Sequence, residues 1–281
     1  PKVVWGIRHS LHDLTKEKRT TRWVIRLGAR LSKKADKVIY NSHSSAAHHR
    51  ALGYNADKEL VIPNGVDCQR FKPSLEARQW LRKEVLGLDD NELLVGMVGR
   101  FHPIKGPDIF LEAAAMLARH RSDAKFLMIG KGMQHRNEAL ESLLKGNGIR
   151  SSVFLLGERS DMERILPGFD VFCSPSLSES FPNALVEAMA CGVPCVVTDV
   201  GDSARIVGEC GLVVSPGDSM SLAHALKKMI EMCEEERKEL GIRARTRIKV
   251  FDHWQMVQRY SSLYEMVSSE SHQSTKGKGG Q

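Results

Sequence analysis

Two glutamates at the start of a predicted helix are the residues of this chain best suited to chemistry. Glu179 stands just before the helix and Glu187 lies two turns inside it, with Ser180 available as a cap and Pro182 suited to the first turn. Free backbone N–H groups and the positive end of a helix dipole suit a phosphate. Ionised carboxylates accept strong hydrogen bonds from vicinal hydroxyls. The segment therefore favours a ligand with phosphates between a sugar and a ribose, although an ordinary helix carboxylate beside a capping acid remains the alternative.

Two cations form the second chemical signal. The apolar run 93–98 ends at Gly99, and Arg100 and Lys105 flank a tight turn that leads into a predicted helix. At the carboxyl end of a central strand, such a pair suits a diphosphate leaving group. Two unrelated surface cations in a loop are the simpler alternative, which the presence of the glutamate pair disfavours.

Two glycines and one histidine complete the candidate site. Gly130 and Gly132 follow the run 125–129, and a second glycine turn at a strand end strengthens the case for a ligand crevice, although Gly-x-Gly alone is weak evidence. His9 follows the first apolar run, where a side chain can face a ligand, but a lone histidine there is more often structural. His12 lies three residues further on, and two histidines without further ligands nearby are weak evidence for a metal site.

The elements that must position these residues alternate along the chain. Short apolar runs and helical stretches take turns, a pattern typical of an α/β fold with a parallel sheet. Strands are expected at residues 3–7, 37–41, 60–62, 93–98, 125–129, 153–156, 171–174, 194–198 and 212–214. Helices are expected at residues 107–119, 137–147, 183–190 and 254–266, with a long stretch at 219–250 that should break near Gly241. The turn Pro63-Asn64-Gly65 separates three strands from six strand–helix units, which are enough for a doubly wound domain.

The overall composition limits the class of protein. The 281 residues are 42% hydrophobic and 27% charged, as in ordinary globular proteins, and no run of about 18 apolar residues predicts a membrane span. The six cysteines lack the C-x-x-C spacing and the histidine partners of a zinc site, so a reducing cytoplasm fits best. The net charge of +7 would by itself fit nucleic acid, an anionic membrane surface or phosphorylated ligands.

Part of this positive charge lies in a basic stripe along one helical stretch. The cations that recur there every three or four residues are Arg19, Arg22, Arg26, Arg30 and Lys33. The apolar residues Trp23, Val24, Leu27 and Leu31 fall on a different face. The pattern is typical of an amphipathic helix. A solvated helix face is one interpretation, and a surface for acidic lipid headgroups is the other.

Taken together, these residues resemble glycosyltransferase family 4, a family of retaining enzymes with the two-lobed GT-B fold, over nearly all of residues 1–268. The motifs that carry the resemblance are Glu179 with Glu187, Arg100 with Lys105, Ile-Pro-Asn-Gly-Val-Asp at 62–67 and Gly-Leu-Val-Val-Ser-Pro-Gly-Asp at 211–218. The resemblance implies a complete Rossmann-like donor-binding domain at residues 68–251. It implies that residues 1–67 are the C-terminal part of an acceptor lobe, so that the chain is an N-terminally truncated fragment. A helix at 252–267 would return to that lobe, and the polar tail 268–281 is expected to be disordered.

The resemblance also implies roles for single residues. In the family the first glutamate contacts the transferred sugar and the second holds the ribose, and the acceptor-lobe histidine near the sugar looks like His9. Catalytic roles are therefore expected for His9, Glu179, Arg100 and Lys105. Donor binding is expected from Gly99, Arg100, Lys105, Gly130, Gly132, Glu179, Ser180, Phe181, Pro182, Asn183 and Glu187. Two departures from the family pattern are Ser180, where glycine is usual, and residues 200–204, where many members have a Gly-Gly-x-Pro-Glu-like loop.

The function expected from these residues is transfer of a hexosyl group from a UDP-, GDP- or ADP-sugar to a hydroxyl acceptor, with retention of the anomeric configuration. No metal, other cofactor or nucleic acid is expected to take part. The acceptor is expected to be a lipid-linked or surface glycan in bacterial polysaccharide biosynthesis. We expect a cytoplasmic enzyme, peripheral on the inner face of an anionic membrane. A nucleotide-sugar epimerase on the same fold and a non-catalytic nucleotide-sugar-binding module are the alternatives.

Overall fold

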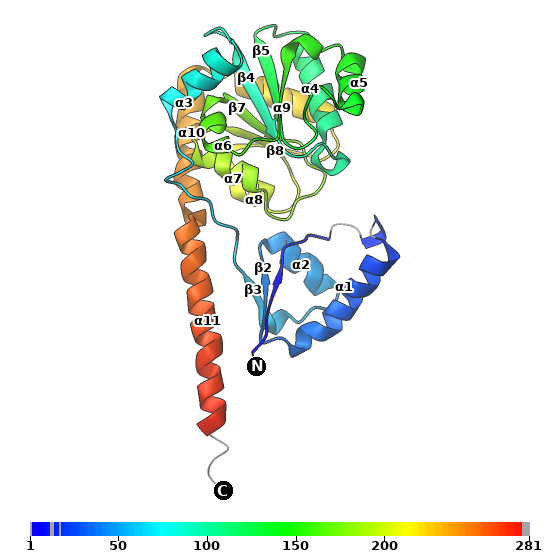
Figure 1. The fold of residues 1–281 in the computed structure, drawn as a ribbon, viewed down its shortest axis with the longest axis vertical. Coiled ribbons are helices and arrows are strands. Elements are labelled where there is room, and N and C mark those ends of the chain that lie inside the picture. Colours follow the sequence, from blue (N-terminus) through cyan, green and yellow to red (C-terminus); the bar gives the residue numbers. More distant parts are fainter. Residues whose placement is uncertain (1, 12–13, 17, 277–281) are drawn as a thin grey trace. The chain divides into compact units, whose positions relative to one another are not determined.

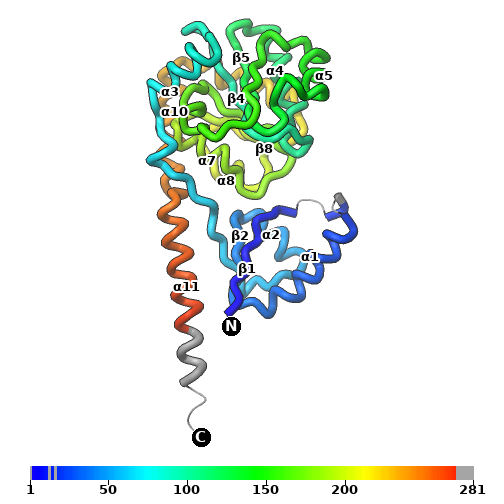
Figure 2. Tube along the Cα trace, in the orientation of Figure 1, coloured from blue at the N-terminus to red at the C-terminus, as the bar shows by residue number. Residues whose placement is uncertain are grey.

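The computed structural model describes residues 2–11, 14–16 and 18–276, and the chain forms two compact units (Figures 1 and 2). The terminal unit comprises the residues up to Gly65 together with those from Phe251 onward, and the central unit spans Val66–Val250. These divisions fall within two residues of the boundaries that we expected after residues 67 and 251.

The central unit is built on a six-stranded parallel sheet in the order β6-β5-β4-β7-β8-β9. Its strands are β4 (Leu93–Val98), β5 (Ala124–Ile129), β6 (Val153–Gly157), β7 (Val171–Ser174), β8 (Cys195–Thr198) and β9 (Gly211–Val214). The chain adds β5 and β6 on one side of β4 and then returns to add β7, β8 and β9 on the other. Strand order therefore reverses between β4 and β7, and open α/β sheets bind ligands outside the carboxyl ends of the strands at such a switch point.

Helices cover this sheet, so its inner strands are almost continuously apolar. They are α3 (Leu75–Gln79), α4 (Pro107–Ala118), α5 (Glu138–Asn147), α6 (Met162–Ile165), α7 (Asn183–Ala190), α8 (Ser203–Val207), α9 (Ser219–Glu231) and α10 (Glu234–Ile248). Helices α4, α5 and α9 share one core with side chains from five of the strands. Within it, Phe110 of α4 meets Phe126 of β5 edge to face, with ring centroids 6.1 Å apart.

The expected break of the long helical stretch near Gly241 is wrong. The chain leaves the helical path at Met232 and Cys233 instead, where Cys233 and Glu236 cap the start of α10 reciprocally. Gly241 lies inside α10, and a Cβ there would come within 2.0 Å of the carbonyl oxygen of Gly192. This glycine therefore permits a close contact between two segments and does not end the helix.

The terminal unit contains a three-stranded parallel sheet in the order β1-β2-β3. The strands are β1 (Val4–Ile7), β2 (Lys37–Tyr40) and β3 (Glu59–Val61), and the helices are α1 (Arg19–Leu31), α2 (His43–Ala51) and α11 (His253–Lys276). Leu263 and Val267 of α11 form a small buried cluster with Ile39 and Ile62. The last helix of the chain is thus part of the core around β2.

The tail that we expected to be disordered from Ser268 is helical in its first part. Helix α11 runs on to Lys276, and residues 277–281 lie outside the described residues. Residues 268–276 contain neither glycine nor proline, and lengthening a helix that has already formed requires no new nucleation.

Helix α1 buries a narrow face that includes two small residues. Ile25, Gly28 and Ala29 are buried, and a Cβ on Gly28 would come within 2.4 Å of the Tyr54 hydroxyl. The apolar residues of the other face are exposed, namely Trp23 (66%), Val24 (60%), Leu27 (37%) and Leu31 (45%). The surface of α1 is therefore both apolar and basic. Among the described residues, we find no helix that is both long enough and apolar enough to cross a bilayer.

Candidate functional site

The residues expected to bind a ligand gather around the switch point of the central unit. Arg100 follows β4 and is exposed, Lys105 ends the turn Pro103–Lys105, and Glu179 lies beyond the end of β7. Lys105 Nζ and Glu179 Oε1 form an ion pair although the two residues are 74 positions apart. The fold thus joins the residue expected to bind a diphosphate to the residue expected to bind a sugar.

Hydroxyl groups that the sequence analysis missed support this carboxylate. Ser176 Oγ donates a hydrogen bond of 2.8 Å to Glu179 Oε1, and Ser176 is only 2% exposed. The Ser176 carbonyl accepts a hydrogen bond of 2.6 Å from Thr198 Oγ1 at the end of β8. Short hydroxyl side chains produce no periodic signal. The sequence feature that could have indicated Ser176 is the run Ser174-Pro175-Ser176 at the end of a buried strand.

Backbone contacts hold the turn that carries Lys105. Leu177 N donates a hydrogen bond of 2.8 Å to the carbonyl of Ile104. Gly106 has a φ of +63°, and a Cβ there would come within 2.3 Å of the Pro175 carbonyl oxygen. A side chain at this position would be strained and would clash, so glycine allows the loops after β4 and β7 to lie against each other.

The glycine turn after β5 packs on the end of β4. Gly130 has a φ of +138°, and a Cβ there would come within 2.1 Å of the Gly99 carbonyl oxygen. Gly132, with a φ of +84°, lies against Phe101. Gly99 itself has room for a Cβ, which would meet the side chain of Lys105 at 3.5 Å. The loop after β5 therefore lies directly against the loop after β4. The missing side chain of Gly130 allows this close approach, whereas Gly99 could carry a side chain.

Helix α7 begins at Asn183, as expected, but Ser180 does not cap it. The N-cap position is Pro182, with a φ of −80° and a ψ of 90°, and no side-chain cap hydrogen bond occurs there. The extended backbone at Pro182 separates Ser180 from the first turn. The Ser180 carbonyl accepts a hydrogen bond from Asp202 N at 3.3 Å instead, while Phe181 is buried.

Glu187 lies in the second turn of α7 and is partly buried. Burial raises the pKa of its carboxyl group to about 7, and this rise is opposed by the charge of Arg70 and reinforced by that of Glu163. Arg70 and Glu163 form an ion pair of 2.9 Å. A carboxyl group that titrates near neutral pH beside an arginine is a candidate functional group.

The loop after β8, which departs from the family pattern, lies against the backbone of the Glu179 segment. Gly201 has a φ of +58°, and a Cβ there would come within 2.5 Å of the Glu179 carbonyl oxygen. The hydroxyl of Ser203 is buried and has no hydrogen-bond partner among the described residues. A side chain at position 201 would be strained and would clash, so this loop requires glycine there.

His9 belongs to the terminal unit and is exposed. Its carbonyl accepts a hydrogen bond of 2.5 Å from Ser45 Oγ, which fixes the backbone at the end of β1. His12 and Asp13 lie outside the described residues. Within the described residues, no three His, Cys, Asp or Glu side chains cluster as metal ligands would.

Comparison with known proteins assigns the chain to a family. A family model described as Glycosyl transferases group 1 matches residues 92–232, and one described as Glycosyltransferase Family 4 matches residues 3–70. The chain belongs to this family of glycosyltransferases, which confirms the resemblance stated above.

Individual glycosyltransferases are similar to this chain in sequence. The UDP-Gal:alpha-D-GlcNAc-diphosphoundecaprenol alpha-1,3-galactosyltransferase of Escherichia coli is 30% identical over 231 residues, which are 76% of this chain and 58% of that protein. A D-inositol 3-phosphate glycosyltransferase of Mycobacterium sp. (strain JLS) is 35% identical over 202 residues, 70% of this chain and 45% of that protein. The chain therefore spans about half the length of these relatives.

Solved structures share the fold. HepE of Anabaena, in complex with UDP, matches with a TM-score of 0.84 and 25% identity over 94% of this chain and 72% of that one. Sucrose-phosphate synthase from Thermosynechococcus elongatus matches with a TM-score of 0.81 and 24% identity over 95% of this chain and 68% of that one. The predicted GT-B fold with Rossmann-like domains is confirmed.

Proposed function

We propose that the whole protein is a retaining glycosyltransferase that transfers a hexosyl group from a nucleotide diphosphate sugar to a hydroxyl acceptor. The observation that carries this proposal is the Lys105–Glu179 pair at the switch point of the sheet, with Glu187 on the helix that follows. Cations at this edge suit phosphates, and carboxylates beside them suit the hydroxyls of a sugar and a ribose.

The donor that best fits the similar proteins is a uridine diphosphate sugar. One solved relative holds UDP, and the name of the Escherichia coli relative includes UDP-Gal. We assign the diphosphate to Arg100 and Lys105, the sugar to Glu179 and the ribose to Glu187. The remaining donor contacts are assigned to Gly99, Gly130, Gly132, Ser180, Phe181, Pro182 and Asn183.

In the proposed reaction, the bond between the anomeric carbon and the diphosphate oxygen breaks as the acceptor oxygen bonds to that carbon from the same face. The acceptor proton passes to the departing phosphate. Arg100 and Lys105 stabilise the negative charge that develops on the leaving group. Glu179 stabilises the positive charge on the sugar, and a catalytic role is assigned to His9. The proposal assigns no nucleophile and requires no metal ion.

Titration calorimetry of the full-length protein with UDP, GDP, ADP and their sugars tests donor binding. Binding of one nucleotide class supports the proposal, and failure to bind any of them overturns it. Incubation with the bound sugar nucleotide alone separates the two alternatives. An epimerase would change the sugar without an acceptor, whereas a binding module would consume no donor even in the presence of hydroxyl acceptors.

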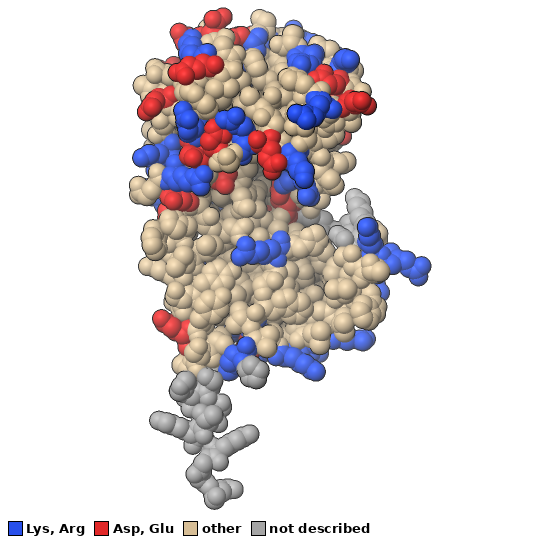
Figure 3. Space-filling view, in the orientation of Figure 1, with Lys and Arg blue, Asp and Glu red and all other residues tan. Residues whose placement is uncertain are grey.

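The proposed place of action is the inner, cytoplasmic face of an anionic membrane, with a lipid-linked or surface glycan as acceptor. Residues 1–65 carry 13 Lys and Arg against five Asp and Glu, so the excess positive charge of the chain resides in them. On the face shown in Figure 3, both signs of charge intermingle on the central unit, whereas the terminal unit shows mainly neutral atoms, with some Lys and Arg and little Asp or Glu. Each cation near an acidic bilayer contributes about 1 kcal/mol. The exposed Trp23 on α1 is of the type that favours the membrane interface.

Vesicle sedimentation of the full-length protein tests this location. Binding to anionic but not neutral vesicles, weakened by high salt, is the expected result, since screening acts over roughly 8–10 Å at physiological ionic strength. Reversing the charge of Arg26 and Arg30 to glutamate should reduce binding. The same reversal at the exposed Arg119 and Lys145 of the central unit is the matched control. If anionic vesicles bind no protein, or if binding survives high salt unchanged, the stripe is only a solvated helix face.

A further inference from the structure

Two donors of different chemistry reach the same oxygen of Glu179. Lys105 Nζ and Ser176 Oγ converge on Glu179 Oε1, from the loop after β4 and from the loop after β7. We infer that Ser176 is a positioning residue for Glu179, a role that rests on the proposed function of Glu179 in holding the transferred sugar.

Lys105 alone is poorly suited to orient the carboxylate during a reaction cycle. Its ammonium group is a point charge on a flexible stem, and 26% of its side chain is exposed. An incoming diphosphate carries more negative charge than Glu179 and competes for the same ammonium group. The Ser176 hydroxyl is neutral, buried and close to the backbone, so a phosphate does not draw it away. Ser176 therefore keeps Glu179 in place when Lys105 turns to the diphosphate.

Ser176 is itself held by the two neighbouring strand ends. Thr198 Oγ1 lies 2.6 Å from the carbonyl oxygen of Ser176 and 3.2 Å from that of Ser174, and Thr198 is 1% exposed. The next residue along, Leu177, is bound to the carbonyl of Ile104 in the Lys105 turn. With its backbone tied on both sides, Ser176 presents its hydroxyl to Glu179 from a fixed position.

The binding test uses UDP, UDP-glucose and UDP-galactose as probes for titration calorimetry of the full-length protein. Ser176→Ala removes the hydroxyl with little change in volume. It should leave the dissociation constant of UDP unchanged within about twofold and weaken the preferred UDP-sugar about tenfold, as loss of a hydrogen bond to a charged group implies. Ser176→Thr, which keeps a hydroxyl, should restore most of the loss. Ser178→Ala removes a hydroxyl from the same loop and is the matched control.

The ratio of the dissociation constant of the UDP-sugar to that of UDP distinguishes a positioning role of Ser176 from a structural role. A variant that only destabilises the protein lowers the fraction of binding-competent molecules and leaves this ratio unchanged. If Ser176→Ala weakens UDP and the UDP-sugar equally, or weakens neither, the inference is overturned.

A double-mutant cycle identifies the partner through which Ser176 acts. In a Glu179→Ala background, Ser176→Ala should weaken binding of the UDP-sugar by less than about twofold more, because the group that it positions is gone. If the two effects multiply instead, Ser176 acts independently of Glu179 and the inference fails. If Glu179→Ala by itself leaves UDP-sugar binding and UDP release unchanged, the proposed role of Glu179 fails, and that of Ser176 fails with it.

Discussion

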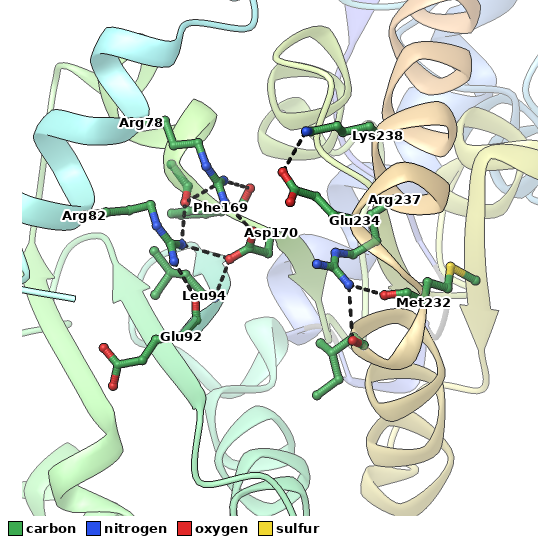
Figure 4. A network of polar contacts seen from close by, with 12 residues as sticks. Arg78, Arg82, Glu92, Leu94, Phe169, Asp170, Met232, Glu234, Arg237 and Lys238 are labelled. Carbon is green, nitrogen blue, oxygen red and sulfur yellow. Dashed lines mark hydrogen bonds and ion pairs between the residues drawn. The ribbon is translucent and has the colours of Figure 1, made fainter. Parts of the chain in front are cut away.

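Strand β7 has an acidic residue near each end, and the two carboxylates are held in different ways. Asp170, directly before the strand, accepts hydrogen bonds from Arg78 Nη2 at 2.6 Å, Arg82 Nη1 at 2.9 Å and Leu94 N at 2.7 Å (Figure 4). Glu179, beyond the other end, accepts hydrogen bonds from Lys105 and from Ser176. Both carboxylates are largely buried, with 7% and 12% of their side chains exposed.

The difference lies in what else the cations bind. Arg78 also donates to the carbonyl oxygens of Gly168 and Phe169, and Arg82 donates to that of Glu92, so the planar groups connect several segments at once. Lys105 contacts Glu179 through a point charge and remains partly exposed. One end of β7 therefore carries a structural network of two ion pairs, and the other end carries a partly exposed pair that, under the proposed function, an anionic ligand would exchange.

The largest expected effect is the loss of stability when Asp170 is removed. Asp170→Ala leaves two arginines without their buried partner and should lower the free energy of unfolding by about 3–5 kcal/mol. Chemical denaturation measures this loss. Glu112→Ala, on the exposed side of α4, is the control and should change stability little. A loss below about 1 kcal/mol for Asp170→Ala would show that the network is not structural.

Substitutions near the Glu179 end of β7 should lower the turnover number and leave the stability of the protein largely unchanged. Lys105→Ala or Arg100→Ala in the full-length enzyme should lower kcat about 100-fold while weakening donor binding much less, because the cations face charge that grows as the diphosphate leaves. Steady-state kinetics with varied donor separates the two effects. An increase in KM with an unchanged kcat would contradict the leaving-group role.

A smaller effect is expected at Glu187. Glu187→Ala should weaken nucleotide binding by about 1.5–3 kcal/mol, the contribution of a hydrogen bond from a ribose hydroxyl to a charged group, and leave the fold intact. Calorimetry with the preferred nucleotide measures the change, and Glu138→Ala at the exposed start of α5 is the control. An unchanged affinity would refute the ribose assignment.

The smallest expected effect is a pH dependence from the same residue. Because the pKa of Glu187 is raised to about 7, a nucleotide that needs the ionised carboxylate should bind up to about tenfold more weakly for each pH unit below 7. Glu187→Gln should remove this dependence. An identical pH profile in the variant would show that another group titrates.

The raised pKa also has a consequence for stability. Between the ordinary value of 4.5 and about 7, the folded protein keeps a proton on Glu187 that the unfolded chain has lost. The contribution of this group to stability therefore falls as the pH rises through that window and is constant above it. Comparing thermal unfolding of Glu187→Gln with that of the parent at pH 5 and pH 8 measures this contribution.

The sequence by itself determined the strands, several of the helices and most residues of the candidate site. Apolar runs located all nine strands, and the bounds of α7 were predicted to the residue. These signals are local, since a run of apolar residues, a proline or a glycine acts on its immediate neighbours. The motif spacing of the family likewise located Glu179, Glu187, Arg100 and Lys105, because spacing is a property of the chain itself.

Only the tertiary structure decided which of these residues meet and which surfaces are covered. Lys105 and Glu179 are 74 positions apart, and Thr198 reaches Ser176 across 22 positions, distances at which no local pattern carries information. Gly241 was mispredicted for the same reason, because a helix-ending glycine and one that admits a neighbouring carbonyl look alike in the sequence. Periodicity showed that Trp23 and Leu27 share a face of α1, but whether that face is buried depends on what packs against it.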